Sequence, residues 1–141
     1  MTPERMADLH AAGFSDDRPW TASEFAALLD GTHAHLTPHD HGFALWRAVA
    51  GEAELLTIVV DPAHRRLGTG GTLMTEWMRA AEPHANTAFL EVAADNTAAC
   101  ALYRRHGFST VARRPAYYRH RTPAVDALVM RAALPAWDAS P

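Results

Sequence analysis

The sequence contains no lysine, and its 141 residues include a single cysteine, Cys100. One cysteine excludes an internal disulfide framework and any zinc cluster built on cysteines. The absence of lysine excludes Schiff-base chemistry on a lysine and a P-loop, which requires one. No apolar run approaches the ~18 residues of a membrane helix, and the first residues carry no secretory apolar segment. We therefore expect a cytoplasmic protein that has no membrane partner.

Charge is divided unevenly along the chain, although the net charge is only −3. Residues 1–61 hold ten carboxylates and three arginines, whereas residues 62–141 hold six carboxylates and ten arginines. The arginine excess in the second part suggests an anionic ligand there. A net negative charge without a dense basic stripe argues against nucleic acid as a partner.

Hydrophobic periodicity and turn residues predict one domain over residues 1–134, followed by a tail over residues 135–141. The order of elements is ααβββαβαββ, which indicates an α/β fold of the α+β type, with helices on the faces of a mixed sheet. We expect turns at 38–42 and 50–52 and a loop rich in tyrosine and arginine before the last strand. The expected helices cover residues 2–13, 21–31, 70–82 and 96–106, and the expected strands cover 32–36, 43–49, 53–60, 87–92, 108–114 and 126–131.

Two of these helices have well-marked ends. Thr21–Glu24 forms a capping box, and the flanking Trp20 and Phe25 can pack as a hydrophobic staple. Asn96 can cap the last helix, which should end at Gly107 with the following phenylalanine as its hydrophobic contact.

The stretch Arg-Arg-Leu-Gly-Thr-Gly-Gly at residues 65–71 lies between a buried strand and a helix. Glycines let a backbone approach a ligand closely. The free N–H groups and the dipole of the following helix favour an anion at this position. The spacing fits neither the Rossmann fingerprint nor a Walker loop. A ligand-free strand–helix turn is the alternative, and the preceding arginine favours a pyrophosphate cradle.

The motif Arg65-x-x-Gly68-x-Gly70 resembles the pyrophosphate loop of the GNAT superfamily of acyl-CoA-dependent N-acetyltransferases. The chain more specifically resembles the bacterial ribosomal-protein-alanine N-acetyltransferases. This resemblance implies a single-domain GNAT fold with a mostly antiparallel central sheet, acetyl-CoA as cosubstrate and no required metal. The segments that carry the closer match are 18–20, 59–62, 90–108 and 113–118.

The resemblance also implies how the cosubstrate is held. The backbone amides from Arg66 to Gly71, with the Arg65 side chain, would hold the pyrophosphate, and the N–H near Val60 is our candidate donor to the tetrahedral oxygen. Gly71 stands where relatives often carry a basic residue. The residues expected to bind acetyl-CoA are Ile58, Val59, Val60, Arg65, Arg66, Leu67, Gly68, Thr69, Gly70, Gly71, Asn96 and Tyr103.

Acetyl transfer to an amine requires removal of a proton and a proton for the leaving thiolate. Glu91 lies in an apolar strand, on the face opposite Leu90 and Val92, where burial would favour a general base. The resemblance implies that Glu91 is this base and that Tyr103 protonates the thiolate. The alternatives are a solvent-facing Glu91 and a Tyr103 that only packs in the core.

The acceptor is expected to be the N-terminal α-amine of a protein, with a ribosomal protein as candidate. An N-terminal α-amine, with a pKa of ~8, loses its proton more readily at neutral pH than a lysine side chain, with a pKa of ~10.4. We expect Trp20, Tyr117 and Tyr118 to bind the acceptor, and the protein to be a monomer or homodimer. A GNAT enzyme for a small amine and a non-catalytic acyl-CoA-binding module remain alternatives.

Four histidines, His33, His35, His39 and His41, flank one predicted turn. A hairpin could gather two to four of their imidazoles into a metal site. A solvated hairpin is the preferred interpretation, so no metal site is expected.

Overall fold

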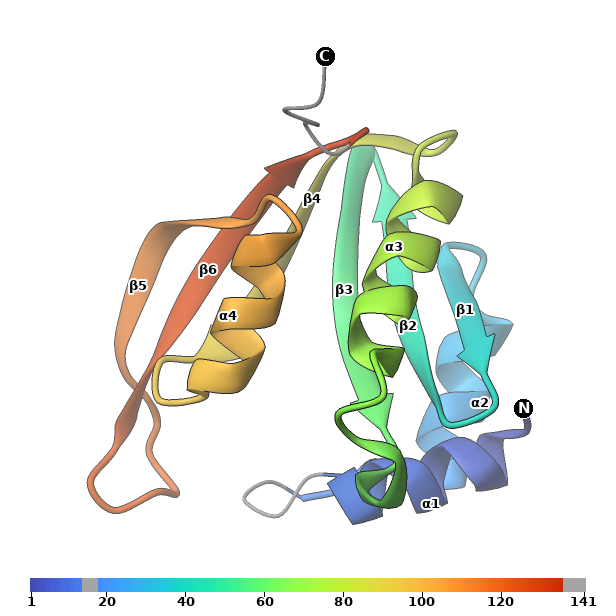
Figure 1. Cartoon of the computed structure of the whole chain (residues 1–141), viewed down its shortest axis with the longest axis horizontal. Helices are drawn as coiled ribbons and strands as arrows, with labels where there is room; N and C mark the ends of the chain where they lie inside the picture. Colours follow the sequence, from blue (N-terminus) through green and yellow to red (C-terminus); the bar gives the residue numbers. More distant parts are fainter. Residues whose placement is uncertain (14–17, 136–141) are drawn as a thin grey trace.

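A computed structural model describes residues 1–13 and 18–135 of the chain. The order of helices and strands agrees with the prediction, with one additional short 3-10 helix, η1, before α3 (Figure 1). The helices are α1 (Pro3–Gly13), α2 (Ala22–Asp30), α3 (Thr69–Ala81) and α4 (Thr97–Arg105), with η1 at Pro62–His64. The strands are β1 (Ala34–His39), β2 (Gly42–Val49), β3 (Gly51–Val60), β4 (Ala85–Ala93), β5 (Ser109–Tyr118) and β6 (Val125–Ala133).

The strands form one sheet of six in the order β1-β2-β3-β4-β6-β5. Strands β3 and β4 are parallel neighbours, and the other neighbouring pairs are antiparallel. The sheet is therefore mixed and mostly antiparallel, as the resemblance implied. The parallel pair lies at its centre and joins two antiparallel halves.

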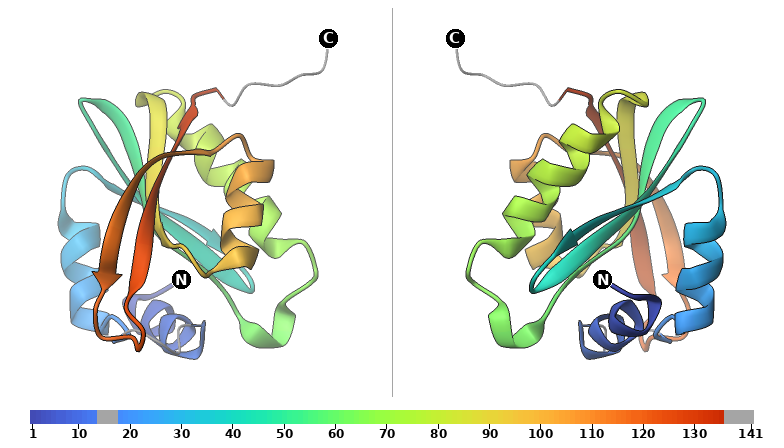
Figure 2. Two further views of the ribbon diagram at one scale, coloured as in Figure 1. Left: turned by 90° about the vertical axis from the view of Figure 1, so that its left-hand side faces the viewer. Right: turned by 90° about the vertical axis from the view of Figure 1, so that its right-hand side faces the viewer.

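The helices lie on both faces of this sheet (Figure 2). On one face, α3 and α4 cover a core that includes Trp46, Trp77, Leu90 and Met130. On the other face, α1 and α2 cover a smaller core formed around Phe25 with residues of β2 and β3. All five apolar residues predicted for the inner face of α3 are buried: Leu73, Met74, Trp77, Met78 and Ala81.

Strands β3 and β4 are paired along only part of their length. Their ladder runs from Gly51↔Ala85 to Glu54↔Phe89, and beyond it the two strands diverge (Figure 1). Just after the ladder, Leu55 and Thr57 oppose consecutive residues of β2, so Leu56 is the extra residue of a β-bulge. A bulge bends and twists its strand. It therefore turns β3 away from β4 at this point and opens the sheet in its middle.

The predicted helix ends are confirmed. The Thr21–Glu24 capping box is present, and the rings of Trp20 and Phe25 lie 5.5 Å apart. Asn96 caps α4 by accepting a hydrogen bond from Ala99 N–H at 3.2 Å. At the other end of α4, Gly107 has φ +93°, and the N–H groups of Gly107 and Phe108 close a Schellman motif on the carbonyls of Arg104 and Tyr103.

Several predicted strand ends were wrong. Strand β3 already begins at Gly51, inside the turn expected at 50–52. Strand β1 continues through Pro38 to His39, where we expected a turn. It is an edge strand, and a proline can lie there without removing a ladder hydrogen bond. Strand β5 continues to Tyr118, so Tyr117 and Tyr118 belong to a strand and not to the loop after it. A bulge between Arg114 and Tyr118 carries the strand past Pro115.

Candidate acetyl-CoA and acceptor site

The loop between β3 and α3 has the backbone geometry of an anion cradle. Arg66 and Gly68 both have positive φ, at 68° and 80°. The first helical hydrogen bond runs from Thr72 N–H to the Gly68 carbonyl at 3.0 Å, and no side chain caps the helix start. The amides of the first turn, at Thr69, Gly70 and Gly71, thus lack acceptors within the helix. These N–H groups can bind a phosphate oxygen at the positive end of the helix dipole.

The side chains of this loop lie differently from their backbone. Arg65 donates from Nη2 to the Gly13 carbonyl at 3.3 Å, so its guanidinium contacts the end of α1. Arg66 is exposed, and Leu67 is 68% exposed. The groups that this loop offers to an anion are therefore backbone amides. A Cβ added at Gly68 would meet no atom within 4 Å. This position therefore favours glycine because of its positive φ and not because of crowding.

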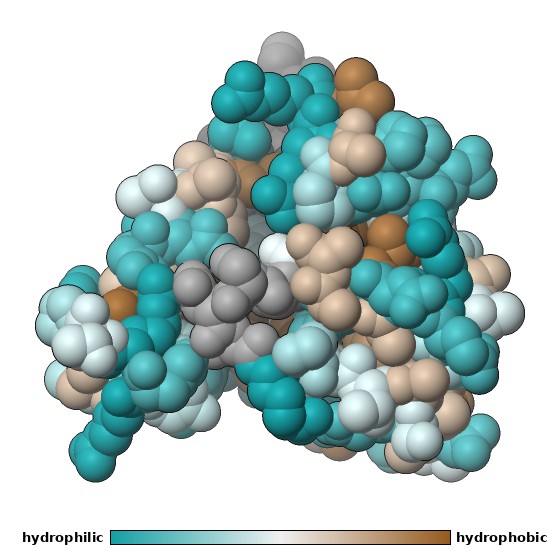
Figure 3. Space-filling view, turned by 90° about the horizontal axis from the view of Figure 1, so that it is seen from below, coloured by the Kyte–Doolittle hydropathy of each residue, from teal (hydrophilic) through white to brown (hydrophobic). Residues whose placement is uncertain are grey.

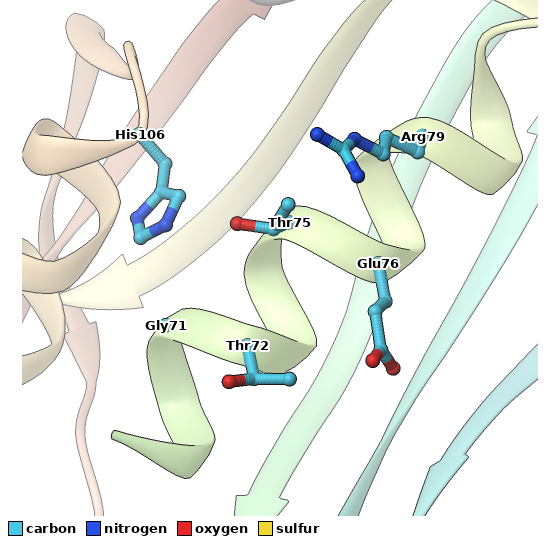
Figure 4. Close-up of a pocket in the computed structure, with 6 residues that line it drawn as sticks. All are labelled: Gly71, Thr72, Thr75, Glu76, Arg79 and His106. Atoms are coloured by element: carbon cyan, nitrogen blue, oxygen red, sulfur yellow. The ribbon is translucent and has the colours of Figure 1, made fainter.

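A hollow of about 440 Å³ lies beside this loop, between α3 and the end of α4. Thr72, Thr75 and Arg79 extend from α3 toward the side on which His106 lies, whereas Glu76 points away (Figure 4). His106 Nδ1 lies 2.9 Å from the Leu102 carbonyl, which can only accept, so Nδ1 carries the proton of this hydrogen bond and Nε2 is left as the second ring nitrogen. His106 is not among the site residues predicted from the sequence. The feature that could have indicated it is Gly71, whose lack of a side chain leaves room in front of the imidazole ring.

The divergence of β3 and β4 leaves backbone groups directed into the gap between them. Asp61 N–H donates to the His41 carbonyl at 2.7 Å. Antiparallel ladders alternate, so the next pair, Gly42↔Val60, is not hydrogen-bonded, and the N–H of Val60 points away from β2. On that side the ladder with β4 has already ended. The Val60 N–H therefore points into the gap between β3 and β4.

Glu91 lies on β4 at the same gap, on the face of the sheet opposite Leu90 and Val92, as alternation predicted. The expected burial is wrong: Glu91 is exposed, because α1 and α2 do not reach over this part of the sheet. Its Oε1 lies 3.1 Å from Nη2 of Arg114, which comes from β5. The carboxylate is therefore ion-paired and accessible to a ligand on that face.

Tyr103 lies on the other face of the sheet, on α4, and is 8% exposed. Burial raises the pKa of the Tyr103 phenol above its ordinary value, and the neighbouring Cys100 and Tyr118 add to this rise. The phenol therefore stays protonated throughout the neutral range and can act as a hydrogen-bond donor. Its ring also packs near Phe108, with centroids 6.2 Å apart, so the core contact considered as an alternative is present too.

Tyr117 and Tyr118 lie at the end of β5, with their rings 5.2 Å apart and edge-to-face. Tyr117 is half exposed and also faces the Arg114 guanidinium, 5.4 Å from the ring centroid. Trp20 is separate from this group: it stacks on His10 at 5.1 Å and packs among the residues of α1 and α2. Seen from below, hydrophilic residues cover much of the surface, and strongly hydrophobic ones appear only in small patches (Figure 3).

The four histidines of the first hairpin do not gather in one place, although the rings of His39 and His41 lie 5.8 Å apart. His35 stacks on Trp46 at 4.3 Å, whereas His41 stacks on His64 at 3.7 Å beside the other end of the strand. Burial lowers the pKa of His35, and the nearby His84 and His33 contribute to this shift. Within residues 1–13 and 18–135, no group of three metal-ligating side chains comes together.

The central strands diverge next to backbone amides that can bind an anion, and Glu91 and Tyr103 lie on opposite faces of the sheet. Comparison with known proteins gives the family: residues 6–108 match the acetyltransferase (GNAT) family, and the chain belongs to it. It is 36% identical to N-alpha-acetyltransferase RimI of Mycobacterium tuberculosis over 137 residues, covering 91% of this chain and 84% of that protein.

Two further comparisons concern an enzyme of Escherichia coli and one of Arabidopsis thaliana. The chain is 34% identical to the [Ribosomal protein bS18]-alanine N-acetyltransferase of E. coli K12, covering 87% of this chain and 89% of that enzyme. The crystal structure of the ribosomal-protein-S18-alanine N-acetyltransferase from E. coli superposes with a TM-score of 0.81 and 28% identity, over 96% and 89% of the two chains. NAA60 of A. thaliana in complex with acetyl-CoA shares the fold, with a TM-score of 0.77 at 18% identity over 94% and 93% of the chains.

The protein is thus an acetyl-CoA-dependent N-acetyltransferase of the GNAT family, and enzymes of this family need no metal. The fold and the cosubstrate expected from the sequence are confirmed. None of the helices in the described residues is long and apolar enough to cross a membrane.

Proposed function

We propose that the enzyme transfers the acetyl group to the N-terminal α-amine of a protein, with a ribosomal protein as the first candidate. The two similar enzymes from M. tuberculosis and E. coli carry names that describe this activity. One observation carries the proposal for this chain: Glu91 lies on one face of β4, and Tyr103 belongs to the core on the other face, together with Leu90 and Val92. An amine and a thioester can therefore meet in the gap from opposite sides, each beside its own proton-exchanging group.

The residues present fit acetyl-CoA. The uncapped amides of Thr69, Gly70 and Gly71 suit the pyrophosphate, and no side chain at either glycine obstructs it. The edge of β3 from Ile58 to Val60 can bind the pantetheine arm through its backbone groups, and Asn96 stands at the start of α4. Arg66 and His106 lie on either side of these amides and suit the 3′-phosphate of coenzyme A.

In the proposed reaction, the amine nitrogen attacks the thioester carbonyl and the carbon–sulfur bond breaks. Glu91 accepts the amine proton, directly or through one water. The Val60 N–H stabilises the negative charge on the tetrahedral oxygen. Tyr103 donates its hydrogen to the departing sulfur, and its raised pKa favours hydrogen bonding over a lasting phenolate. Solvent then removes the proton from Glu91 and returns one to Tyr103.

On the acceptor side, we propose that the peptide enters beside the end of β5, where Tyr117 and Tyr118 present aromatic surface. We propose a purely packing role in α1 and α2 for Trp20, because its ring stacks on His10. A ribosomal acceptor would place the reaction in the cytoplasm, with residues 1–134 acting as one domain.

Mass spectrometry of N-terminal peptides incubated with enzyme and acetyl-CoA tests the proposal. We expect a mass gain of one acetyl group on the α-amine of ribosomal N-terminal peptides. Glu91→Gln should reduce turnover by roughly 10²–10⁴-fold, the range for loss of a general base. Binding of acetyl-CoA, measured by calorimetry, should stay unchanged in this variant. Peptides that remain inert while polyamines or amino acids are acetylated would instead support a small-amine enzyme.

A further inference from the structure

Arg114 links the proposed base to the proposed acceptor surface. It is paired with Ala127 in register, and Ala127 with Ala93, so its side chain lies on the same face of the sheet as Glu91. Its guanidinium reaches across β6 to Glu91 at 3.1 Å and lies 5.4 Å from the Tyr117 ring centroid. One cation thus contacts both the carboxylate and the aromatic ring beside which the acceptor would enter.

The pair is accessible to solvent, which limits what it adds to stability. Exposed ion pairs contribute little to folding because water and salt screen them. Its effect on a ligand is different. An acceptor that arrives as an ammonium ion meets a guanidinium already bound to Glu91, and like charges in contact oppose its binding. A neutral amine meets no such repulsion and can donate to the carboxylate.

We propose that Arg114 is a positioning and specificity-determining residue, which orients the Glu91 carboxylate and selects acceptors that lose their proton easily. At pH 7 about a tenth of α-amines are neutral, with a pKa of ~8, whereas only about one lysine ε-amine in 2,500 is neutral, with a pKa of ~10.4. A cation beside the base therefore favours α-amines over lysine side chains. This inference rests on the proposed function, because it assigns the acceptor preference of the same site.

The structure offers a matched control on the neighbouring strand. Arg131 of β6 also pairs with a glutamate, Glu52, at 3.6 Å, and it also lies over a ring, 5.3 Å from the Phe89 centroid. Both arginines lie on the same face of the sheet and have exposed side chains. Only Arg114 contacts the proposed base.

The experiment compares two peptides, one with a free α-amine and no lysine and one with a blocked N-terminus and a single lysine. We expect Arg114→Gln to lower the ratio of kcat/KM for the α-amine to that for the ε-amine by about tenfold or more, a change that corresponds to one charge interaction of modest strength. Arg114→Lys, which keeps the charge, should stay closer to the wild-type ratio, and Arg131→Gln should equal it. The KM for acetyl-CoA and the melting temperature should not change.

An unchanged ratio in Arg114→Gln, or an equal fall in Arg131→Gln, overturns the inference. A measurement on the unmodified enzyme gives a second test, because salt screens exposed charges. Raising the ionic strength should lower the wild-type ratio, and a ratio that is independent of salt contradicts the proposal. A wild-type enzyme that acetylates no α-amine at all would instead refute the proposed function.

Discussion

The two halves of the sheet carry the same kinds of side chain but are covered differently. Strands β1, β2 and β3 have helices on both faces, α1 and α2 on one and α3 on the other. Strands β4, β6 and β5 are covered by α4 on one face, and the opposite face carries exposed charges such as Glu91, Arg114 and Arg131. We expect the covered half to contribute more of the stability of the fold. The open half presents charged side chains to solvent, and the proposed reaction takes place where the two halves separate.

Removing the same side chain from each half tests whether the two halves differ in stability. Phe43 on β2 and Phe89 on β4 lie on the same face of the sheet, but Phe43 is fully buried beneath α1 and α2 and Phe89 is partly exposed beside Arg131. Phe43→Ala should cost roughly 3–5 kcal/mol of unfolding free energy, the range for a truncated core phenylalanine. Phe89→Ala should cost about 1 kcal/mol or less, as for most surface substitutions. Urea denaturation measures both, and equal losses would contradict the division.

Where the halves separate, two glycines of the phosphate loop should respond in opposite ways. Gly68 has φ +80°, so Gly68→Ala should destabilise the fold by about 1–2 kcal/mol and weaken acetyl-CoA binding. Gly71 lies inside α3, where an added Cβ would make an ordinary contact of 3.9 Å with His106. Gly71→Ala should therefore stabilise the fold by up to about 1 kcal/mol through helix propensity. Thermal melting with and without coenzyme A separates the two effects, and two glycines that respond alike would exclude a left-handed requirement at Gly68.

Features that depend on residues close together in the sequence could be predicted from it. The ends of α4 followed from Asn96 and Gly107, each read within a few residues of the helix it closes. The sequence did not predict what depends on distant segments. Glu91 is exposed because α1 and α2 cover the other half of the sheet, and no residue near Glu91 reports this. Its partner Arg114 is brought to it by the pairing of β5 with β6 and of β6 with β4.

A smaller effect is expected at the start of α2, in the covered half. Thr21 accepts a hydrogen bond from Glu24 N–H at 3.1 Å, so Thr21→Ala should cost about 1 kcal/mol, as is usual for a lost cap. The hydrogen bond from Arg18 and the backbone hydrogen bond from Thr21 lower the pKa of Glu24 to about 2. A depressed carboxyl pKa stabilises the fold above the unfolded value of 4.5, and this contribution is lost as the pH falls toward 2. Arg18→Gln removes the largest cause of this shift and should flatten the pH dependence in this window, whereas Thr21→Ala keeps the backbone N–H donor and should retain most of it.

The smallest expected effect lies in the open half, at the bulge that brings Tyr117 and Tyr118 into β5. Asp126 accepts from Ala116 N–H at 2.7 Å and from Arg113 Nε at 2.5 Å, and Ala116 has φ +50°. The backbone hydrogen bond is the main cause that lowers the pKa of Asp126 below 3.8, and the Arg113 side chain adds to it.

Because the folded pKa is the lower one, the Asp126 contribution is complete above the unfolded value and disappears as the pH falls below about 4. Asp126→Asn should therefore shift stability slightly and only above this pH, while raising the KM for peptide acceptors because the bulge no longer holds both tyrosines. The KM for acetyl-CoA should stay constant, since the loop between β3 and α3 lies on the other side of the gap between β3 and β4. Equal changes in both KM values would mean that the bulge supports the whole site and not the acceptor side alone.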